Sequence, residues 1–90
     1  MIDHPPLPIE RVQTGVRVEK RLLKVLKALA EVHDTTLGDL LEGIVLHAFE
    51  GRSPFSAEGI RKIEQLKAVY GLDYDARAAH HFTEAEPPNE

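Results

Sequence analysis

Between residues 11 and 18, β-branched and polar residues alternate along the chain. This period of two predicts a β-strand with one apolar face and one polar face. The expected inward residues are Val12, Thr14, Val16 and Val18, and the expected outward residues are Gln13, Gly15 and Arg17. No other run has this period, so the backbone of the strand needs a partner from outside the chain. We therefore expect it to pair with the same strand of a second copy, as an antiparallel ribbon across a two-fold axis.

Three helices are predicted after this strand, because apolar residues recur every three or four positions over residues 20–33, 37–49 and 57–70. Residues that commonly begin or end helices mark their boundaries: His33, Asp34, Thr35, Thr36, Gly51, Ser56 and Gly71. Gly43 lies inside the second helix, where it indicates either close approach of a neighbouring helix or simple tolerance.

These elements divide the chain into four parts. Residues 1–10 form an extended arm with three prolines, and residues 11–51 form the strand and two core helices. Residues 52–82 form a helical extension, whose helix either completes the core or presents a surface to a protein partner. Within the extension, Leu72, Tyr74 and Phe82 are expected to cover the edge of the core. Residues 83–90 are expected to be a disordered acidic tail.

The composition favours an oligomer. A chain of 90 residues buries little apolar surface, and without cysteine it has neither a disulfide nor a thiolate zinc site to compensate. Self-association is the common remedy. The N-terminus lacks the features of a secretory signal, and no apolar run is long enough to span a membrane. We therefore expect a cytoplasmic homodimer with no membrane segment.

Charge is distributed unevenly along the chain. The net charge is −4, but residues 11–27 contain six basic residues and one acidic residue, a net charge of +5. In the first helix, Lys20, Lys24 and Lys27 are expected on the face opposite the apolar stripe. Such a cationic segment is typical of proteins that bind nucleic acid, although short helices also often carry a lysine-rich solvated face.

The order of strand, amphipathic helix, tight turn and second helix between Val12 and Phe49 resembles the ribbon-helix-helix superfamily of small dimeric bacterial DNA-binding proteins. The resemblance covers somewhat under half of the chain. It implies a mainly α ribbon-helix-helix fold with a C-terminal helical extension. It also implies that the paired strands enter the DNA major groove, where Gln13, Gly15 and Arg17 would occupy the base-reading positions. The Arg fork suits guanine and the Gln amide suits adenine, whereas Gly15 leaves the middle position empty.

Phosphate contacts are expected at two places. The resemblance implies that backbone N–H groups at the start of the second helix, at Thr36, Leu37 and Gly38, hold a phosphate. This position is chemically suitable because a helix N-terminus attracts anions, although Asp34 and Asp39 flank it. The other expected phosphate-contacting residues lie on the first helix and are Lys20, Arg21 and Lys24.

Catalysis has little support in the sequence. The chain lacks a cysteine nucleophile, a glycine-rich phosphate loop and a recognisable carboxylate pair, and the adjacent His80 and His81 are a weak metal signal. We expect neither an enzyme nor a bound metal or cofactor. The leading hypothesis is a homodimeric transcriptional regulator, a repressor that binds an inverted-repeat operator in double-stranded DNA. The alternative is a homodimeric protein-interaction module that does not bind DNA.

Overall fold

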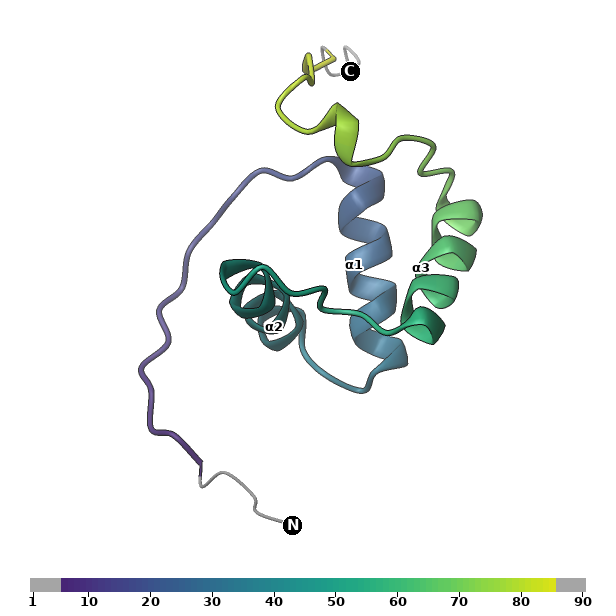
Figure 1. Ribbon diagram of the computed structural model, residues 1–90. Coiled ribbons are helices and arrows are strands. Elements are labelled where there is room, and N and C mark those ends of the chain that lie inside the picture. Colours follow the sequence, from purple (N-terminus) through teal and green to yellow (C-terminus); the bar gives the residue numbers. More distant parts are fainter. Residues whose placement is uncertain (1–5, 86–90) are drawn as a thin grey trace.

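The computed structural model describes residues 6–85 and contains three α-helices (Figure 1). Helix α1 spans Lys20–Val32, α2 spans Leu37–Phe49 and α3 spans Ala57–Tyr70. A single 3-10 turn, η1, follows at Ala76–Ala78. The helices lie where the apolar periodicity predicts them, to within one residue at each end.

Local capping interactions explain this agreement. The Thr36 side chain accepts a hydrogen bond from the backbone N–H of Asp39 at 3.0 Å, and Ser56 caps α3 in the same way. At the other ends, Gly51 and Gly71 adopt the left-handed conformation, with φ of 68° and 69°. Both glycines stop their helices as expected. Gly43 is different: no neighbouring atom lies within 4 Å of where a side-chain Cβ would be, so close approach within this chain does not explain it.

Helix α1 is the centre of the fold. Helix α3 lies alongside it and α2 crosses it, whereas α2 and α3 do not contact each other (Figure 1). Four apolar residues among those described are buried. Three of them lie on α1, namely Val25, Leu29 and Ala30, and the fourth is Leu72. Because α3 packs on α1 and Leu72, two residues after α3, is buried, the C-terminal extension contributes to the core, as the first of its two interpretations predicted.

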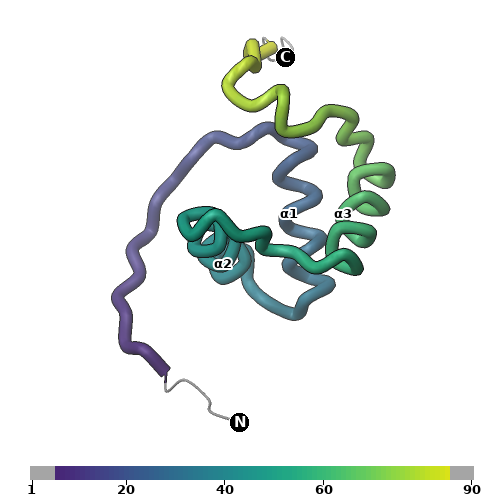
Figure 2. Tube along the Cα trace, viewed as in Figure 1, coloured from purple at the N-terminus to yellow at the C-terminus, as the bar shows by residue number. Residues whose placement is uncertain are grey.

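The predicted ribbon-helix-helix fold is wrong for this chain. Within residues 6–85 the structure contains no β-strand, and the protein is a small all-α chain. Residues 6–19 run as an extended segment that leaves the start of α1 and passes α2 (Figure 2). The expected inward residues are not buried, since Val12 is 81% exposed and Val16 is 76% exposed. A strand is defined by its hydrogen-bond ladder, and residues 6–85 contain no second strand to supply one.

Two further expectations concern the ends of the chain and membranes. The remaining parts of the N-terminal arm and the acidic tail, residues 1–5 and 86–90, lie outside the described residues. Residues 83–85 have no regular secondary structure. Across residues 6–85, no helix combines the length and the apolar character needed to cross a membrane.

Candidate nucleic-acid interface

A row of three lysines marks the outer face of α1. Lys20, Lys24 and Lys27 are all exposed, on the side of the helix opposite the buried Val25 and Leu29. None of the ion pairs in the described part of the chain involves these lysines. Glu31, also exposed, follows Lys27 by one turn and ends the row. The helix therefore presents three ammonium groups along about two turns, a spacing that can follow a phosphate backbone.

Arg21 is placed differently from the lysines. Its Nη1 donates hydrogen bonds to the carbonyl oxygen of Gly71 at 2.9 Å and to Asp73 Oδ1 at 3.2 Å. Its guanidinium also lies 5.6 Å from the ring centroid of Tyr74, a cation–π distance. Arg21 thus connects the start of α1 to the segment after α3, and its donors are used inside the protein.

Glu19 completes this connection from the N-cap position of α1. Its carboxylate accepts a hydrogen bond from the Arg21 backbone N–H at 2.9 Å and another from the Tyr74 hydroxyl at 2.6 Å. These two hydrogen bonds lower the pKa of Glu19 to about 2. Burial, followed by the hydrogen bond to Glu19, raises the pKa of Tyr74 to about 12. We call Glu19, Arg21, Asp73 and Tyr74 the C-terminal clamp.

The expected base-reading residues lie on the extended segment before α1. Gln13, Gly15 and Arg17 are exposed, and the Arg17 guanidinium forms an ion pair with Glu84, 67 residues later in the chain. Arg11 makes a bidentate pair with Glu42 of α2, at 2.8 and 2.9 Å. This pair connects the extended segment to α2, and the hydrogen bonds from Arg11 lower the pKa of Glu42.

A carboxylate of the protein, that of Asp39, lies in the same helical turn as the expected phosphate anchor at the start of α2. The N–H of Asp39 is bonded to Thr36, and the Asp39 carboxylate accepts a hydrogen bond from the Thr35 hydroxyl at 2.8 Å. Leu37 and Gly38 lie in the same first turn. Because Asp39 places a negative charge at the positive end of the helix dipole, it opposes a phosphate at this position.

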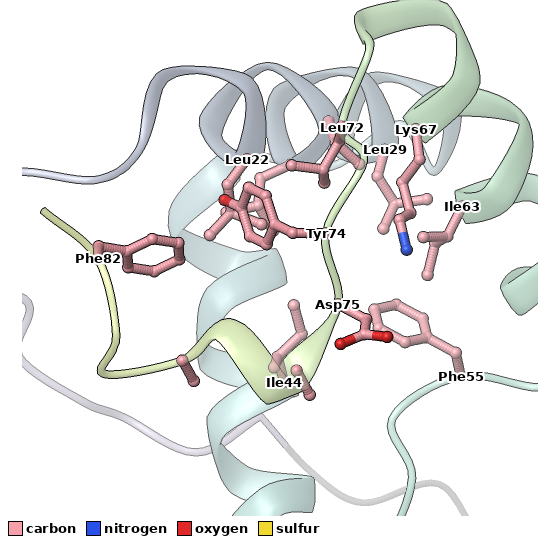
Figure 3. A pocket seen from close by; sticks show the side chains of 14 residues that line it. Leu22, Leu29, Ile44, Phe55, Ile63, Lys67, Leu72, Tyr74, Asp75 and Phe82 are labelled. Carbon is pink, nitrogen blue, oxygen red and sulfur yellow. The ribbon is translucent and has the colours of Figure 1, made fainter. Parts of the chain in front are cut away.

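An apolar groove lies between the helices, below the C-terminal segment (Figure 3). Its volume is about 350 Å³, and side chains from α1, α2, α3 and residues 72–82 line it. Tyr74 and Phe82 close one side, with their rings edge to face at a centroid distance of 5.2 Å. Leu72, Tyr74 and Phe82 therefore cover the edge of the core as predicted.

A second apolar surface lies on the outer side of α2. Helix α2 is the most apolar of the three, yet none of its residues is buried. Leu41, Val45 and Phe49 follow one another at intervals of four residues and are exposed, with Phe49 at 81%. Leu46 lies beside this row and is 62% exposed. These four residues are called the α2 apolar face below.

The structure thus separates the expected DNA-binding residues into groups. Lys20 and Lys24 share one open helix face with Lys27, Arg21 belongs to the clamp, and the residues at the start of α2 lie on another helix. Glu19 was not predicted, and Tyr74 was expected only at the edge of the core and not as the hydrogen-bond partner of Glu19. An acidic residue directly before a helix could have identified Glu19 as an N-cap, but Tyr74 is 55 residues away and leaves no local signal.

Within residues 6–85, no group of three or more His, Asp or Glu side chains is placed to hold a metal ion. Comparison with protein-family models, with curated proteins and with solved structures finds no match to this chain. The resemblance to ribbon-helix-helix proteins therefore gains no support from known relatives.

Proposed function

We propose that the protein is a DNA-binding regulator that acts as a homodimer. The observation that carries this proposal is the open lysine row of α1, because a row of cations that forms no ion pair within residues 6–85 is suited to phosphates. Phosphate contacts of this kind supply affinity and orientation, but they do not distinguish sequences.

In this proposal, sequence preference comes from the extended segment that leads into the row. Gln13 and Arg17 carry side chains that can bind base edges in the major groove. The acidic partner of Arg17 does not prevent this, because an exposed ion pair contributes only about 0–1 kcal/mol and a phosphate or base can replace it. Gly15 offers its backbone alone.

The homodimer in this proposal is formed by the α2 apolar face. Leu41, Val45, Leu46 and Phe49 lie on one helix, and all four are exposed among the described residues. The same face on a second copy is complementary in character, and a two-fold axis brings the two together. With two copies of the cationic segment on one assembly, the DNA site is expected to be an inverted repeat.

Titration with DNA tests the proposal. Duplexes selected from a random pool by the wild-type protein are labelled, and binding is followed by fluorescence anisotropy at several salt concentrations. We expect Lys24→Ala to weaken binding to all duplexes alike and to make the salt dependence shallower by about 0.9 per lost phosphate contact. Arg61→Ala is the matched control, because it removes one exposed positive charge from α3 instead of α1.

Two results would contradict the proposal. One is a wild-type protein that selects no duplex over random DNA at about 0.15 M salt. The other is an equal loss of affinity in Lys24→Ala and Arg61→Ala, since this would reflect net charge and not a binding face.

The second candidate is a homodimeric protein-interaction module that does not bind DNA. It is favoured by the acidic partners of three arginines in the cationic segment, namely Arg11, Arg17 and Arg21. This candidate shares the α2 apolar face with the first. A protein that self-associates but selects no DNA would fit the second candidate alone.

A further inference from the structure

The segment after α3 returns to the start of α1 and lies on the cationic part of the chain (Figure 1). Two kinds of contact hold it there. In the C-terminal clamp, Arg21 donates hydrogen bonds to Gly71 and Asp73, and Tyr74 donates one to Glu19. On the apolar side, Leu72 is buried and Phe82 packs edge to face against Tyr74. Residues 71–85 therefore form a strap that residues 71–74 anchor to the start of α1, with Phe82 packed on Tyr74 within it.

This strap delivers a carboxylate to the residue proposed to read DNA. Glu84 follows the packed Phe82 by two residues and pairs with Arg17. Both side chains are exposed, so the pair itself contributes little to the stability of the fold. Its effect on binding is limited by the free energy of the pair, and it is present at every protein concentration because the competing carboxylate is tethered to the same chain.

We infer that the strap is an intramolecular competitor of DNA, with Glu84 occupying the guanidinium that a base edge or phosphate would otherwise bind. This inference rests on the proposed DNA-binding function. Binding of DNA must exchange the Glu84 carboxylate for an acceptor on DNA at Arg17, and the clamp keeps Glu84 close enough to rebind. The strap thus lowers affinity for all duplexes and favours those whose contacts to Arg17 are strongest.

The full-length Glu84→Gln variant tests this inference, because it keeps the shape of the side chain and removes its charge. We expect its DNA affinity to rise by about two- to fivefold, the range that an exposed ion pair allows. Glu50→Gln is the matched control, since it also removes one carboxylate paired with an arginine, Arg52, at the far end of α2. The control reports the general effect of net charge and is expected to raise affinity less.

Arg17→Ala supplies the decisive comparison. If Glu84 acts by occupying Arg17, Glu84→Gln should raise affinity in the wild-type background and have no effect in the Arg17→Ala background. The inference would be overturned by equal gains of DNA affinity in both backgrounds, or by equal gains in Glu84→Gln and Glu50→Gln. These results differ from failure of the proposed function, in which neither the wild-type protein nor Glu84→Gln binds DNA.

A measurement without DNA separates the two failures further. The Arg17 side-chain Nε–Hε resonance should shift in Glu84→Gln and stay in place in Glu50→Gln. A resonance that ignores both substitutions would show that Glu84 does not occupy Arg17, and this would overturn the inference whether or not the protein binds DNA.

Discussion

Helices α1 and α2 have the same length but differ in how far the rest of the chain buries them. Helix α1 is sharply amphipathic, and its apolar side provides three of the four buried core residues. Helix α2 is more apolar overall but buries none of its residues, and its outer row of Leu41, Val45 and Phe49 faces outward. Residues 6–85 thus cover the apolar side of α1 but leave the outer row of α2 exposed, and it is there that we propose a second copy packs.

The largest expected effect comes from the core side of α1. Leu29 is 1% exposed, so Leu29→Ala should leave a cavity and lower the free energy of unfolding by about 2–5 kcal/mol. Urea denaturation measures this loss, which should appear at every protein concentration. A loss below 1 kcal/mol, like that of an ordinary surface substitution, would show that α1 is not the centre of the core.

The next effect concerns the α2 apolar face. Phe49→Gln should weaken self-association by about tenfold or more, because it removes a large aromatic surface from the proposed interface. The urea midpoint of the wild-type protein should rise with protein concentration, and this dependence should diminish in the variant. Val69→Gln, at an exposed position near the end of α3, is the control. Equal behaviour of both variants would contradict a specific role for α2.

A smaller effect is expected at the C-terminal clamp, and it depends on pH. The folded pKa of Glu19, about 2, lies below its ordinary value of 4.5. Its contribution is therefore complete above pH 4.5 and is lost as the pH falls towards 2. At pH 7, Glu19→Gln should destabilise the protein by about 1 kcal/mol, and the difference from wild type should vanish in acid. A difference that does not change between pH 7 and pH 2 would contradict this account.

Tyr74 gives the same clamp an alkaline limit. Its folded pKa of about 12 lies above the ordinary value of 10, so the neutral hydroxyl contributes fully below pH 10 and its contribution is lost towards pH 12. Ultraviolet absorbance of tyrosinate follows this titration directly. In Glu19→Gln the pKa of Tyr74 should fall, because the negative charge that opposes ionisation of the hydroxyl is gone. An unchanged titration would show that Glu19 does not raise the pKa of Tyr74.

The smallest effect is expected at Gly43 on α2. Because nothing in the chain lies within 4 Å of a Cβ there, Gly43→Ala should raise the free energy of unfolding by about 0.5–1 kcal/mol. Thermal unfolding measures the change. If Gly43→Ala instead lowers both the stability and the self-association of the protein, a second copy must approach Gly43 closely. The proposed interface would then extend around α2.

The sequence predicted the parts of this molecule that local interactions determine. Thr36, Ser56, Gly51 and Gly71 fix helix ends through bonds and backbone conformations within a few residues. Local interactions could not decide whether residues 11–18 form a strand. Its alternating pattern is real, but a strand forms only with a partner, and the described chain contains none.

The candidate site was predictable only in part for the same reason. The lysine row follows from helical periodicity and lies where it was expected. Arg21, in contrast, looked like another phosphate-binding residue, and only the fold reveals that its guanidinium donates to Gly71 and Asp73 and lies over the Tyr74 ring. Contacts between residues 50 or more positions apart leave no periodic trace in one sequence.

Sedimentation of the wild-type protein at micromolar concentrations tests the central claim most directly, since both proposed functions require a second copy on α2. The chain has a mass of 10.1 kDa. We expect a species of twice this mass that dissociates only on dilution. A folded, monodisperse species of 10.1 kDa throughout the concentration range would contradict it.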